Sequence, residues 1–455
     1  MKKIKYIDLF AGIGGFRYGF ESACTELGIS AKCVFTSEIK PHAIKIYEAN
    51  FPNDKINGDI TKIDSEKIPK FDVLLAGFPC QAFSSAGKRQ GFLDTRGTLF
   101  FEIERILKSH NPPAFILENV EGLVNHDKLN SKDKIGQTLD TILKRLNELG
   151  YKTNWKVLDA SNFGIAQARK RIFIVGTKLN HISLDDFPIN QIPLKNFLEQ
   201  GILSNPLKIS DVLFKKFNPT QLYGKSIKDK RGGSDNIHSW DIELKGKVNN
   251  EQKLVLEKIL RARRNKKWGE LKGIVWMDGM PLTIEEIKTF CNISNLKKLL
   301  DDLVDKNYLT FEHPKDVVEI VEENVVKKIR MPREDLPKGY NIVAGKLSFE
   351  VSKILHPDKA APTLVATDIG RVAVIDGITL RRLTLIEQLR LFGFPDNFKV
   401  PVKETLAHDV FGNTVPVVVV EAISKRLLSK VFLKTDYVEK QILNVNSKQK
   451  SLEFS

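Results

Sequence analysis

The chain has 455 residues, 42% of them hydrophobic, which is enough for a sizeable buried core and for two or three domains. It carries 71 lysine and arginine residues against 56 acidic ones, a formal net charge of +15. A chain this basic is drawn to polyanions such as nucleic acid, although a generally lysine-rich composition explains the charge equally well. No apolar stretch approaches the length of a membrane span, and the first apolar run stops at Gly12, too short for a signal peptide.

The cysteines are few and irregularly spaced, at Cys24, Cys33, Cys80 and Cys291. No two of them form a CxxC pair, so we expect no zinc site and no other bound metal. Four thiols in a chain of this length do not make a disulfide framework, which indicates a reducing compartment and a cytoplasmic location.

The first third of the chain alternates between strand and helix patterns. The expected strands cover residues 4–10, 32–37, 72–77, 114–117 and 171–175, and the expected helices cover 16–27, 42–50, 99–108 and 137–149. Strands that alternate with helices predict an α/β fold with a doubly wound, mostly parallel sheet. In such sheets, ligands bind beyond the carboxyl ends of the strands.

The regular alternation ends near Thr177. Residues 181–250 lack long periodic runs, two or three helices follow between 251 and 315, and residues 316–375 are irregular or strand-like. Order returns near Leu380, and a further helix is expected over 416–432. The last twenty residues are polar and are expected to be frayed.

The segment from Asp8 to Gly15 places three glycines between the first strand and the first helix, where the backbone can approach a ligand closely. It is not a dinucleotide-binding GxGxxG turn, because Arg17 stands in place of the third glycine. Glu38, at the end of the second strand, could accept both ribose hydroxyls, and Asp59 could accept an adenine amine. A glycine turn alone is about as often structural, but the three features in this order favour a nucleoside site.

Cys80 lies in the segment Gly-Phe-Pro-Cys-Gln-Ala-Phe-Ser-Ser, directly after the strand expected over 72–77. A lone cysteine is more often an inert core residue, but a loop rich in serine and glycine after a proline is a poor place for one. Lys88, Arg89 and Arg96 follow in the same loop. Basic side chains near a thiol favour the reactive thiolate, and they could also hold phosphates.

Two further motifs combine charge with a strand end. The apolar run Phe-Ile-Leu-Glu-Asn-Val ends its strand in Glu118, and Gln-Ala-Arg-Lys-Arg, residues 167–171, precedes the strand over 171–175. If that strand begins early, Arg169 and Arg171 point to the same side of it. Taken singly, the carboxylate is typical of a helix cap or surface group, and the arginines are typical of a solvated edge.

Together these elements closely resemble the cytosine-5 DNA methyltransferases. The resemblance continues in Gly-Phe-Leu-Asp-Thr-Arg-Gly-Thr-Leu-Phe-Phe-Glu-Ile after the cysteine, in Arg381-Arg-Leu-Thr and Phe392-Gly-Phe-Pro, and in Gly412-Asn-Thr-Val-Pro416. It spans residues 4–180 and 380–432, a little over half of the chain. The combination of Pro-Cys-Gln, Glu-Asn-Val and Gln-x-Arg-x-Arg is highly specific, whereas each motif alone is not.

The resemblance implies transfer of a methyl group from S-adenosylmethionine to carbon 5 of a cytosine flipped out of double-stranded DNA. It implies that the Cys80 thiolate adds to carbon 6, that Glu118 protonates or hydrogen-bonds ring nitrogen 3, and that Arg169 and Arg171 hold the base oxygen, orient Glu118 and stabilise the thiolate. The residues implied to line the cofactor site are Phe10, Gly12, Gly14, Gly15, Glu38, Ile39, Asp59, Ile60, Pro79, Leu99, Asn413 and Val415. Those expected to contact DNA are Gln81, Ser84, Lys88, Arg96, Arg261, Arg263, Arg264 and Thr363.

The resemblance also implies an adenosylmethionine-dependent methyltransferase fold with a smaller inserted domain. The catalytic domain would comprise residues 1–180 and a returning helix over 412–435, with a target-recognition domain over 181–375, a hinge and linking segment over 376–411 and a polar tail over 436–455. The basic run at 261–267 would commonly be a solvated helix face, but in this domain we favour phosphate contact. We expect a monomer on DNA and, in function only, a cognate restriction endonuclease.

Three other functions are less well supported by the sequence. Transfer-RNA methyltransferases of the same fold have a much shorter recognition region than the insert here. A DNA-binding protein without activity would not need intact Cys80, Glu118 and paired arginines. Arg17 and the Pro-Cys-Gln loop disfavour a nicotinamide oxidoreductase.

Within the insert, helices are expected over 283–290 and 296–306, separated by a turn and followed by a strand over 308–312. This order is typical of a winged helix, which would bring the start of its second helix to DNA. The residues concerned are Asn292, Ser294, Asn295, Lys297 and Lys298. Three aspartates on the outer face, at 301, 302 and 305, would repel the DNA backbone, so a scaffold for other recognition loops is the slightly favoured alternative.

Overall fold

The structure is a computed structural model, and it describes residues 2–79, 99–130, 132–202, 207–229, 233, 235–275, 279–322, 325–343 and 349–433. The chain divides into two compact units. The first unit comprises residues 1–199, 357–370 and 383–455, and the second comprises residues 200–356 and 371–382. Each unit is therefore assembled from separate stretches of sequence.

These boundaries differ from the expected ones. The second unit begins at residue 200 rather than 181, because the intervening residues pack on the first unit, where Ile182 and Leu184 lie in the core. Residues 357–370 also return to the first unit, in which the Ala361 N–H donates to the Ala166 carbonyl at 2.8 Å. The tail expected over 436–455 lies outside the described residues.

The first unit contains a six-stranded sheet in the order β2-β1-β3-β4-β6-β5. β1 pairs in parallel with β2 and β3, and β3 with β4, whereas β6 runs antiparallel to both β4 and β5. The predicted α/β fold with a mostly parallel sheet is confirmed. The strands are β1 (Lys3–Leu9), β2 (Ser30–Ser37), β3 (Val73–Gly77), β4 (Ala114–Val120), β5 (Lys152–Asp159) and β6 (Lys170–Thr177).

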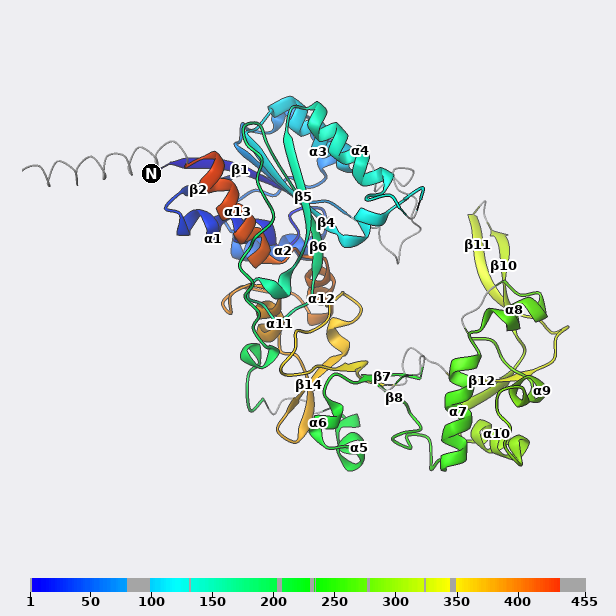
Figure 1. The fold of residues 1–455 in the computed structure, drawn as a ribbon. Helices are drawn as coiled ribbons and strands as arrows, with labels where there is room; N and C mark the ends of the chain where they lie inside the picture. The colour runs from blue at the N-terminus through cyan, green and yellow to red at the C-terminus, as the bar shows by residue number, and fades with distance from the viewer. Residues whose placement is uncertain are drawn as a thin grey trace, which may run out of the picture. The chain divides into compact units, whose positions relative to one another are not determined.

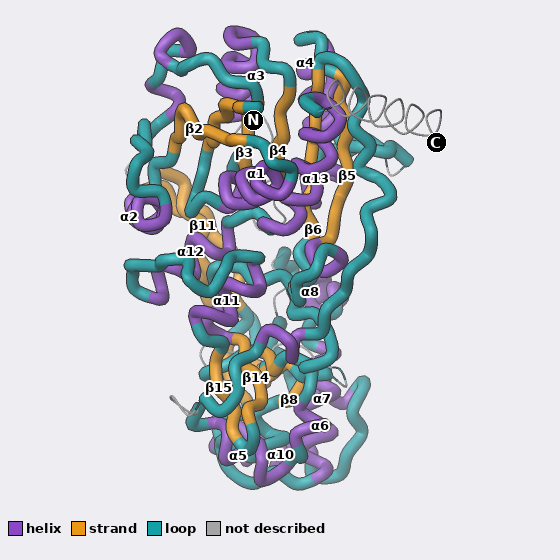
Figure 2. The backbone as a smooth tube through the Cα atoms, turned by 90° about the vertical axis from the view of Figure 1, so that its left-hand side faces the viewer, coloured by secondary structure: helices purple, strands orange, loops and turns teal. Residues whose placement is uncertain are grey.

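Helices cover both faces of this sheet (Figure 1). Alternation along the strands sends Tyr6 and Leu75 into one core and Ile7 and Leu74 into the other. α1 (Gly15–Glu26) and α13 (Val417–Val431) pack side by side on the first face (Figure 2). α3 (Leu99–His110) and α4 (Gln137–Glu148) pack on the second. The carboxyl ends of β1 to β4 therefore meet at one edge between two helical layers.

The strand β5 is the one element of this sheet that the sequence did not predict. Its residues, Lys-Thr-Asn-Trp-Lys-Val-Leu-Asp, lie at the edge of the sheet, and most of their side chains are half-buried. An edge strand of this kind needs no continuous apolar run, so its sequence lacks the pattern that identified its neighbours.

The remaining helices of the first unit are α2 (Pro41–Asn50), α11 (Leu385–Phe392) and α12 (Glu404–Asn413). By length and composition alone, Glu404–Val431 is apolar enough to cross a membrane, but it consists of two helices, of which α13 lies in the core against α1. Short 3₁₀ helices are η1 (Ile60–Lys62), η2 (Ser65–Lys67), η4 (Glu121–Asn125), η5 (Ala160–Asn162), η6 (Leu194–Phe197) and η7 (Ile369–Arg371).

The second unit contains a five-stranded sheet in the order β15-β14-β13-β7-β8. Two helices, α5 (Ile209–Lys216) and α6 (Pro219–Leu222), share its hydrophobic core through Leu213 and Leu222. The strands are β7 (Ser226–Ile227), β8 (Asn236–Ile237), β13 (Lys353–Ile354), β14 (Val372–Asp376) and β15 (Thr379–Arg382).

Residues 249–343 of this unit, the helical lobe, have a core of their own around Leu256, Leu300 and Tyr308. β9 pairs with β12. The antiparallel pair β10 and β11 lies between β9 and β12 in the sequence, which is the position of the wing in a winged helix. The expected order of helix, turn, helix and strand is present, but a DNA-reading role stays a prediction. The elements are α7 (Asn250–Ala262), α8 (Lys266–Lys272), α9 (Ile284–Lys288), α10 (Leu296–Asp305), β9 (Leu309–Glu312), β10 (Lys315–Glu322), β11 (Val325–Pro332) and β12 (Gly339–Ile342).

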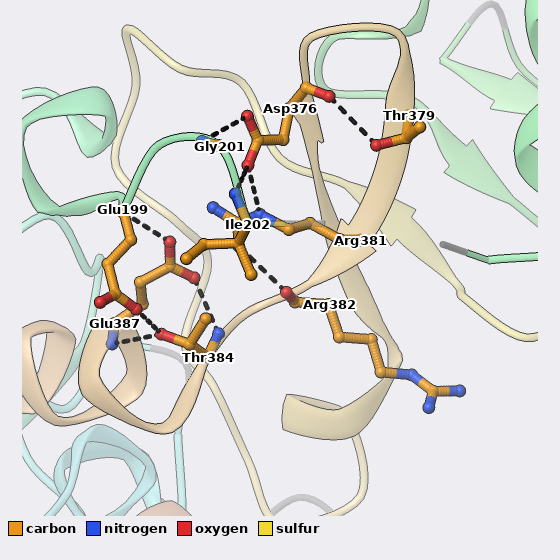
Figure 3. Close-up of polar contacts among 9 residues, drawn as sticks. All are labelled: Glu199, Gly201, Ile202, Asp376, Thr379, Arg381, Arg382, Thr384 and Glu387. Carbon is orange, nitrogen blue, oxygen red and sulfur yellow. Dashed lines mark hydrogen bonds and ion pairs between the residues drawn. The ribbon is translucent and has the colours of Figure 1, made fainter. Parts of the chain in front are cut away.

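The Arg-Arg-Leu-Thr motif spans a point where the chain passes from one unit to the other (Figure 3). In the second unit, Asp376 accepts the Ile202 N–H at 3.1 Å and pairs with Arg381 Nε at 2.8 Å. In the first unit, Glu387 on α11 accepts the Glu199 N–H at 2.8 Å. Where the chain passes between the units, each unit therefore holds its own part of the passing segments by hydrogen bonds within that unit.

Candidate active site

The glycine turn begins where β1 ends. Gly12 and Gly14 have φ values of +57° and +90°, a left-handed conformation that glycine adopts without strain, and Phe10 has a φ of +55°. A Cβ atom on Gly14 would lie 2.6 Å from the Phe51 ring, and one on Gly15 would lie 2.7 Å from Thr414 Oγ1. Glycine is therefore needed here for the turn to pack closely against α2 and the segment before α13.

Glu38 follows β2 and is hydrogen-bonded to this turn. Its Oε2 accepts the Gly12 N–H at 2.7 Å, and its Oε1 accepts the N–H groups of Ile39 and Lys40 at 2.8 Å each. A carboxylate offers about four acceptor sites, so about one remains for a ligand hydroxyl. The expected contact with two ribose hydroxyls is thus reduced to one unless a backbone bond is given up.

Five further residues are predicted to line the cofactor site, namely Ile39, Asp59, Ile60, Pro79 and Leu99, and they differ in how exposed they are. Asp59 Oδ1 accepts the backbone N–H and the hydroxyl of Thr61. Its Oδ2 lies 3.9 Å from Lys62 Nζ, beyond hydrogen-bond distance, and can still accept an adenine amine. Ile60 is buried in the core, whereas Ile39 is 66% exposed, a rare state for isoleucine that suits contact with a ligand. Pro79, after β3, and Leu99, at the start of α3, are half-buried.

Near the carboxyl end of β4, the buried Glu118 forms an ion pair with Arg171, whose side chain is 12% exposed. The register of the sheet places Glu118 opposite Gly77, the last residue of β3. Because β6 runs antiparallel to β4, its first residues lie beside the last residues of β4, and Arg171 Nε comes within 3.0 Å of Glu118 Oε1. The structure thus brings these two predicted catalytic residues together.

The surroundings of Glu118 favour its protonated form. Burial raises the pKa of Glu118 above its ordinary value, whereas the charges of Arg171 and Arg169 act in the opposite direction. A carboxyl group whose pKa is raised in this way keeps its proton to a higher pH than an ordinary glutamate and is better suited to share it with a base, as a general acid must.

Arg169 has different partners from the second arginine of its motif. β6 begins at Lys170, so the condition under which Arg169 and Arg171 would point to the same side, a strand that begins before Arg169, is not met. Its buried guanidinium donates to the carbonyls of Gly412 and Thr414 at 2.8 Å each and of Leu364 at 3.2 Å. These bonds hold the segment before α13 at the active-site edge, a positioning role that the sequence did not suggest.

The end of α12 and the segment that follows it contribute the last two predicted cofactor residues, Asn413 and Val415. Val415 is buried beside Gly77, the last residue of β3. A Cβ atom added to Gly77 would lie 3.4 Å from Val415 Cγ1 and 3.4 Å from Glu118 Oε2. Asn413 is exposed, and its amide donates to the Asp409 carbonyl at 2.6 Å. The returning segment therefore reaches the end of β3 and the catalytic acid, as the resemblance requires.

The cysteine loop falls on residues 80–98, which lie outside the described residues, and β3 leads directly to it. Asn119, next to Glu118, donates from Nδ2 to the Phe78 carbonyl at 3.2 Å and so ties the start of the loop to the end of β4. The Glu-Asn-Val motif contains this asparagine, but the sequence pattern does not indicate its role. The predicted residues in the loop are Cys80, Gln81, Ser84, Lys88 and Arg96.

Thr363 and Gln167 fasten another returning segment to the first unit. The Thr363 hydroxyl donates to the Ala168 carbonyl at 2.6 Å, so the predicted contact with the DNA backbone would have to share or replace this bond. Gln167 is fully buried, donates to the Leu391 carbonyl at 2.9 Å and accepts the Leu364 N–H at 3.2 Å. Its place in Gln-x-Arg-x-Arg was the only sequence signal of this role.

The basic run at the end of α7 contains both buried and exposed arginines. Arg263 is 2% exposed and donates from Nη1 to Asn341 Oδ1 at 2.8 Å, so the structure corrects the expected phosphate contact for this residue. It lies four residues after the buried Ile259, on the face that α7 turns to the lobe core. Arg261 is exposed and Arg264 is half-buried, and both stay candidates for DNA contact.

A family model for C-5 cytosine-specific DNA methylases matches residues 4–429. The chain belongs to this family. It is 53% identical to the Type II methyltransferase M.NlaIV of Neisseria lactamica and 52% identical to M.NgoBV of Neisseria gonorrhoeae. Each match covers 94% of this chain and 99% of the relative. The resemblance drawn from the motifs is confirmed, and the protein is a DNA (cytosine-5) methyltransferase.

Solved structures support the same fold for this methylase. A prophage-encoded DNA modification methyltransferase of E. coli matches with a TM-score of 0.51 and 20% identity, covering 94% of this chain and 99% of that one. The S. pombe Dnmt2 methyltransferase matches with a TM-score of 0.50 and 17% identity, with the same coverage. At these identities the likeness concerns the fold alone, and it confirms the expected methyltransferase fold.

Proposed function

We propose that this methyltransferase transfers a methyl group from S-adenosylmethionine to carbon 5 of a cytosine flipped out of double-stranded DNA, with Cys80 as the nucleophile. The observation that carries the proposal is the ion pair of the buried Glu118 with Arg171, 3.0 Å apart, at the edge where β3 leads to Cys80. An acid with a raised pKa beside a fixed cation is suited to protonate the ring nitrogen of a base.

The residues around the glycine turn fit S-adenosylmethionine. A Cβ on Gly12 would meet no atom within 4 Å, so the backbone there is open to a ligand. Glu38 keeps an acceptor for a ribose hydroxyl, Asp59 keeps one for an adenine amine, and Ile39 offers exposed apolar surface. When bound, S-adenosylmethionine supplies the methyl group. It carries no phosphate, which agrees with Arg17 being turned inward to Tyr47 and away from a phosphate-binding role.

Carbon 5 of cytosine is a poor nucleophile until its ring is activated. In the proposed reaction, the Cys80 thiolate forms a bond to carbon 6, and the ring electrons shift toward carbon 5 and nitrogen 3. Glu118 gives a proton or a hydrogen bond to nitrogen 3, and Arg171 holds its carboxyl group in place. Once carbon 5 is methylated, loss of its proton breaks the bond to Cys80 and restores the ring.

The target carbon is out of reach inside a duplex, so the base must be flipped at a cost of a few kcal/mol. We infer that Gln81, Ser84, Lys88 and Arg96 contact DNA from the cysteine loop. The second unit is the proposed target-recognition domain, with Arg261 and Arg264 as its phosphate contacts. Thr363 is retained as a backbone contact only if it gives up its bond to the first unit.

The relatives named Type II methyltransferases suggest the biological setting. We infer that the enzyme acts as a monomer on DNA in the cytoplasm and protects host DNA from a cognate restriction endonuclease. We infer that its target sequence is set mainly by the second unit, because the motifs of the first unit are assigned to the cofactor, the flipped base and the DNA contacts of the cysteine loop.

Bisulfite sequencing tests the proposed function directly. DNA from cells that express the wild-type chain should carry methylated cytosines in one sequence context, and DNA from cells that express Cys80→Ser should carry none. Purified Cys80→Ser should still bind DNA, because the nucleophile is separate from the phosphate contacts. Unmodified cytosines with the wild type, or substantial turnover by Cys80→Ser, would contradict the proposal.

A further inference from the structure

One carboxylate on α12 joins this helix to the start of α2. Asp409 Oδ2 accepts Lys40 Nζ at 3.0 Å and His42 Nε2 at 2.8 Å. Lys40 is the N-cap residue of α2, and His42 lies in its first turn. None of these three residues belongs to a motif identified in the sequence.

Both ends of this contact lead to predicted cofactor residues. On one side, the Lys40 N–H donates to Glu38 Oε1 at 2.8 Å. On the other side, Asn413 Nδ2 donates to the Asp409 carbonyl at 2.6 Å. A continuous series of contacts therefore runs from Glu38 through Lys40 and Asp409 to Asn413. It connects two sides of the proposed cofactor site that come from opposite ends of the chain.

A second link at the other end of α2 fastens the segment before α12. Asn50 and Lys399 exchange two hydrogen bonds at 2.8 Å, one from the Asn50 amide to the Lys399 carbonyl and one from the Lys399 N–H to the Asn50 Oδ1. The segment leading to α12 thus stays attached when the Asp409 contact is absent. Arg169 also holds the Gly412 and Thr414 carbonyls on either side of Asn413. Removal of the Asp409 carboxylate should therefore loosen the contact between α12 and the start of α2 without detaching either end of α12.

We propose that Asp409 is a positioning residue for the cofactor, which acts by holding Asn413 in register with Glu38. The proposal rests on the cofactor site inferred above. Loss of the carboxylate would let α12 move away from α2, weaken the grip on the adenosyl group and speed its dissociation. The methyl transfer itself would be unaffected once the site is filled, because Glu118 and Arg171 are held by separate contacts within the sheet.

The contact between Asp409, Lys40 and His42 is partly exposed to solvent, so we expect it to act locally. The side chains of Lys40 and Asp409 are 43% and 41% exposed, and that of His42 is 23% exposed. Although partial burial acts to raise it, the hydrogen bonds from His42 and Lys40 hold the pKa of Asp409 below its ordinary value. The carboxylate is therefore ionised across the working pH range. Ion pairs this exposed add little to global stability, so they can be removed without unfolding the unit.

The test is to measure binding of S-adenosylmethionine and S-adenosylhomocysteine to purified Asp409→Asn by calorimetry and stopped flow. We expect Kd to rise about three- to tenfold for both, mainly through faster dissociation. The single-turnover methylation rate at saturating cofactor should stay within about twofold of the wild type, since the chemical step is untouched. The thermal unfolding midpoint should not change.

Asp396→Asn is the matched control. Asp396 also pairs with a cation in the first unit, Arg390, at 2.6 and 2.8 Å, and its side chain is 52% exposed. Its removal should leave cofactor binding unchanged. Lys40→Ala should weaken binding in the same direction but less than Asp409→Asn does, because the bond from His42 to Asp409 remains. The double variant should be little worse than Asp409→Asn alone, because Lys40 acts through Asp409.

The outcomes separate the two proposals. If the wild type does not bind S-adenosylmethionine, the proposed function fails. If the wild type binds and Asp409→Asn binds equally well, or loses single-turnover rate with Kd unchanged, the positioning role is wrong and the proposed function stands. If Asp409→Asn does not fold, the comparison of Lys40→Ala with Asp396→Asn decides in the same way.

Discussion

The two units of this methyltransferase differ in how their charged side chains are placed. In the first unit, Glu118 lies near the end of a strand, and the pairing of neighbouring strands brings Arg171 to it. In the second unit, Arg261 and Arg263 lie at a helix end, two positions apart, yet one is exposed and the other is buried in the lobe. A motif at a strand end thus predicts a site, whereas a run of charge on a helix does not say which side chains face solvent.

The largest effect should come from the strand-end site. We expect Glu118→Gln to lower the single-turnover rate by about 10² to 10⁴, the range for loss of a general acid. Glutamine keeps the size of the side chain, and its amide can still donate a hydrogen bond to nitrogen 3, but it cannot transfer a proton to it. Quench-flow methylation at saturating cofactor and DNA measures this rate.

Cofactor binding is the control for that variant. Glu118→Gln should bind S-adenosylmethionine nearly as the wild type does, whereas Glu38→Ala should lose affinity first, because Glu38 bonds to the glycine turn. A collapse of cofactor affinity with an intact single-turnover rate in Glu118→Gln would show that its assigned role is wrong.

The next effect concerns a buried acid beneath the glycine turn. Asp8, on β1, is completely buried, and burial raises its pKa to about 8, with Arg17 acting in the opposite direction. In the unfolded chain, the carboxyl group has its ordinary pKa of 3.8, so between about pH 4 and pH 8 the unfolded state binds fewer protons than the folded state. The free energy of unfolding therefore falls as the pH rises through this range. At about 1.4 kcal/mol per pKa unit, the upper bound of this loss is ~6 kcal/mol.

Asp8→Asn should remove most of this pH dependence, because the amide stays neutral. Urea unfolding of both proteins at about pH 5 and pH 8 measures it through the linkage between proton binding and stability. The variant should be the more stable of the two at the higher pH. Parallel losses of stability in both proteins would mean that Asp8 is ionised in the folded state.

The sequence predicted most strands of the sheet and the charged residue Glu118 near the carboxyl end of β4, because apolar strands, glycine turns and strand-end charges depend on residues close together in the chain. It missed β5, whose edge position needs no apolar pattern. It also missed the roles of Arg169, Gln167 and Asp409, whose partners lie hundreds of residues away. Side-chain contacts between distant segments leave no periodic signal in the sequence of either one.

A smaller effect should separate the two arginines of the lobe. Arg263→Ala leaves the buried Asn341 oxygen without its guanidinium donor and should reduce stability by about 1–3 kcal/mol. Arg261→Ala should leave stability unchanged and reduce the log–log salt slope of DNA binding by about one. Urea unfolding and DNA titrations at several salt concentrations measure the two effects. The reverse assignment, with Arg263 changing only the salt slope, would contradict the structure of the lobe.

The smallest effect is expected at α10. Lys297 pairs with Asp301 at 2.5 Å, and Asp301 also accepts the Tyr340 hydroxyl at 2.7 Å, so this face is already engaged within the lobe. Joint replacement of Asn295 and Lys297 with alanine should leave the methylated sequence context unchanged, as a scaffold role requires. A relaxed or shifted context in bisulfite sequencing would instead show that α10 reads bases.

Covalent trapping tests the central claim, the attack of Cys80 on carbon 6, most directly. DNA with 5-fluorocytosine at the target position lacks the proton whose loss releases the enzyme. In the presence of S-adenosylmethionine, the wild type should form a complex with this DNA that survives denaturing electrophoresis, and Cys80→Ser should form none. A wild type that methylates ordinary DNA at its normal rate but forms no such complex would contradict the account.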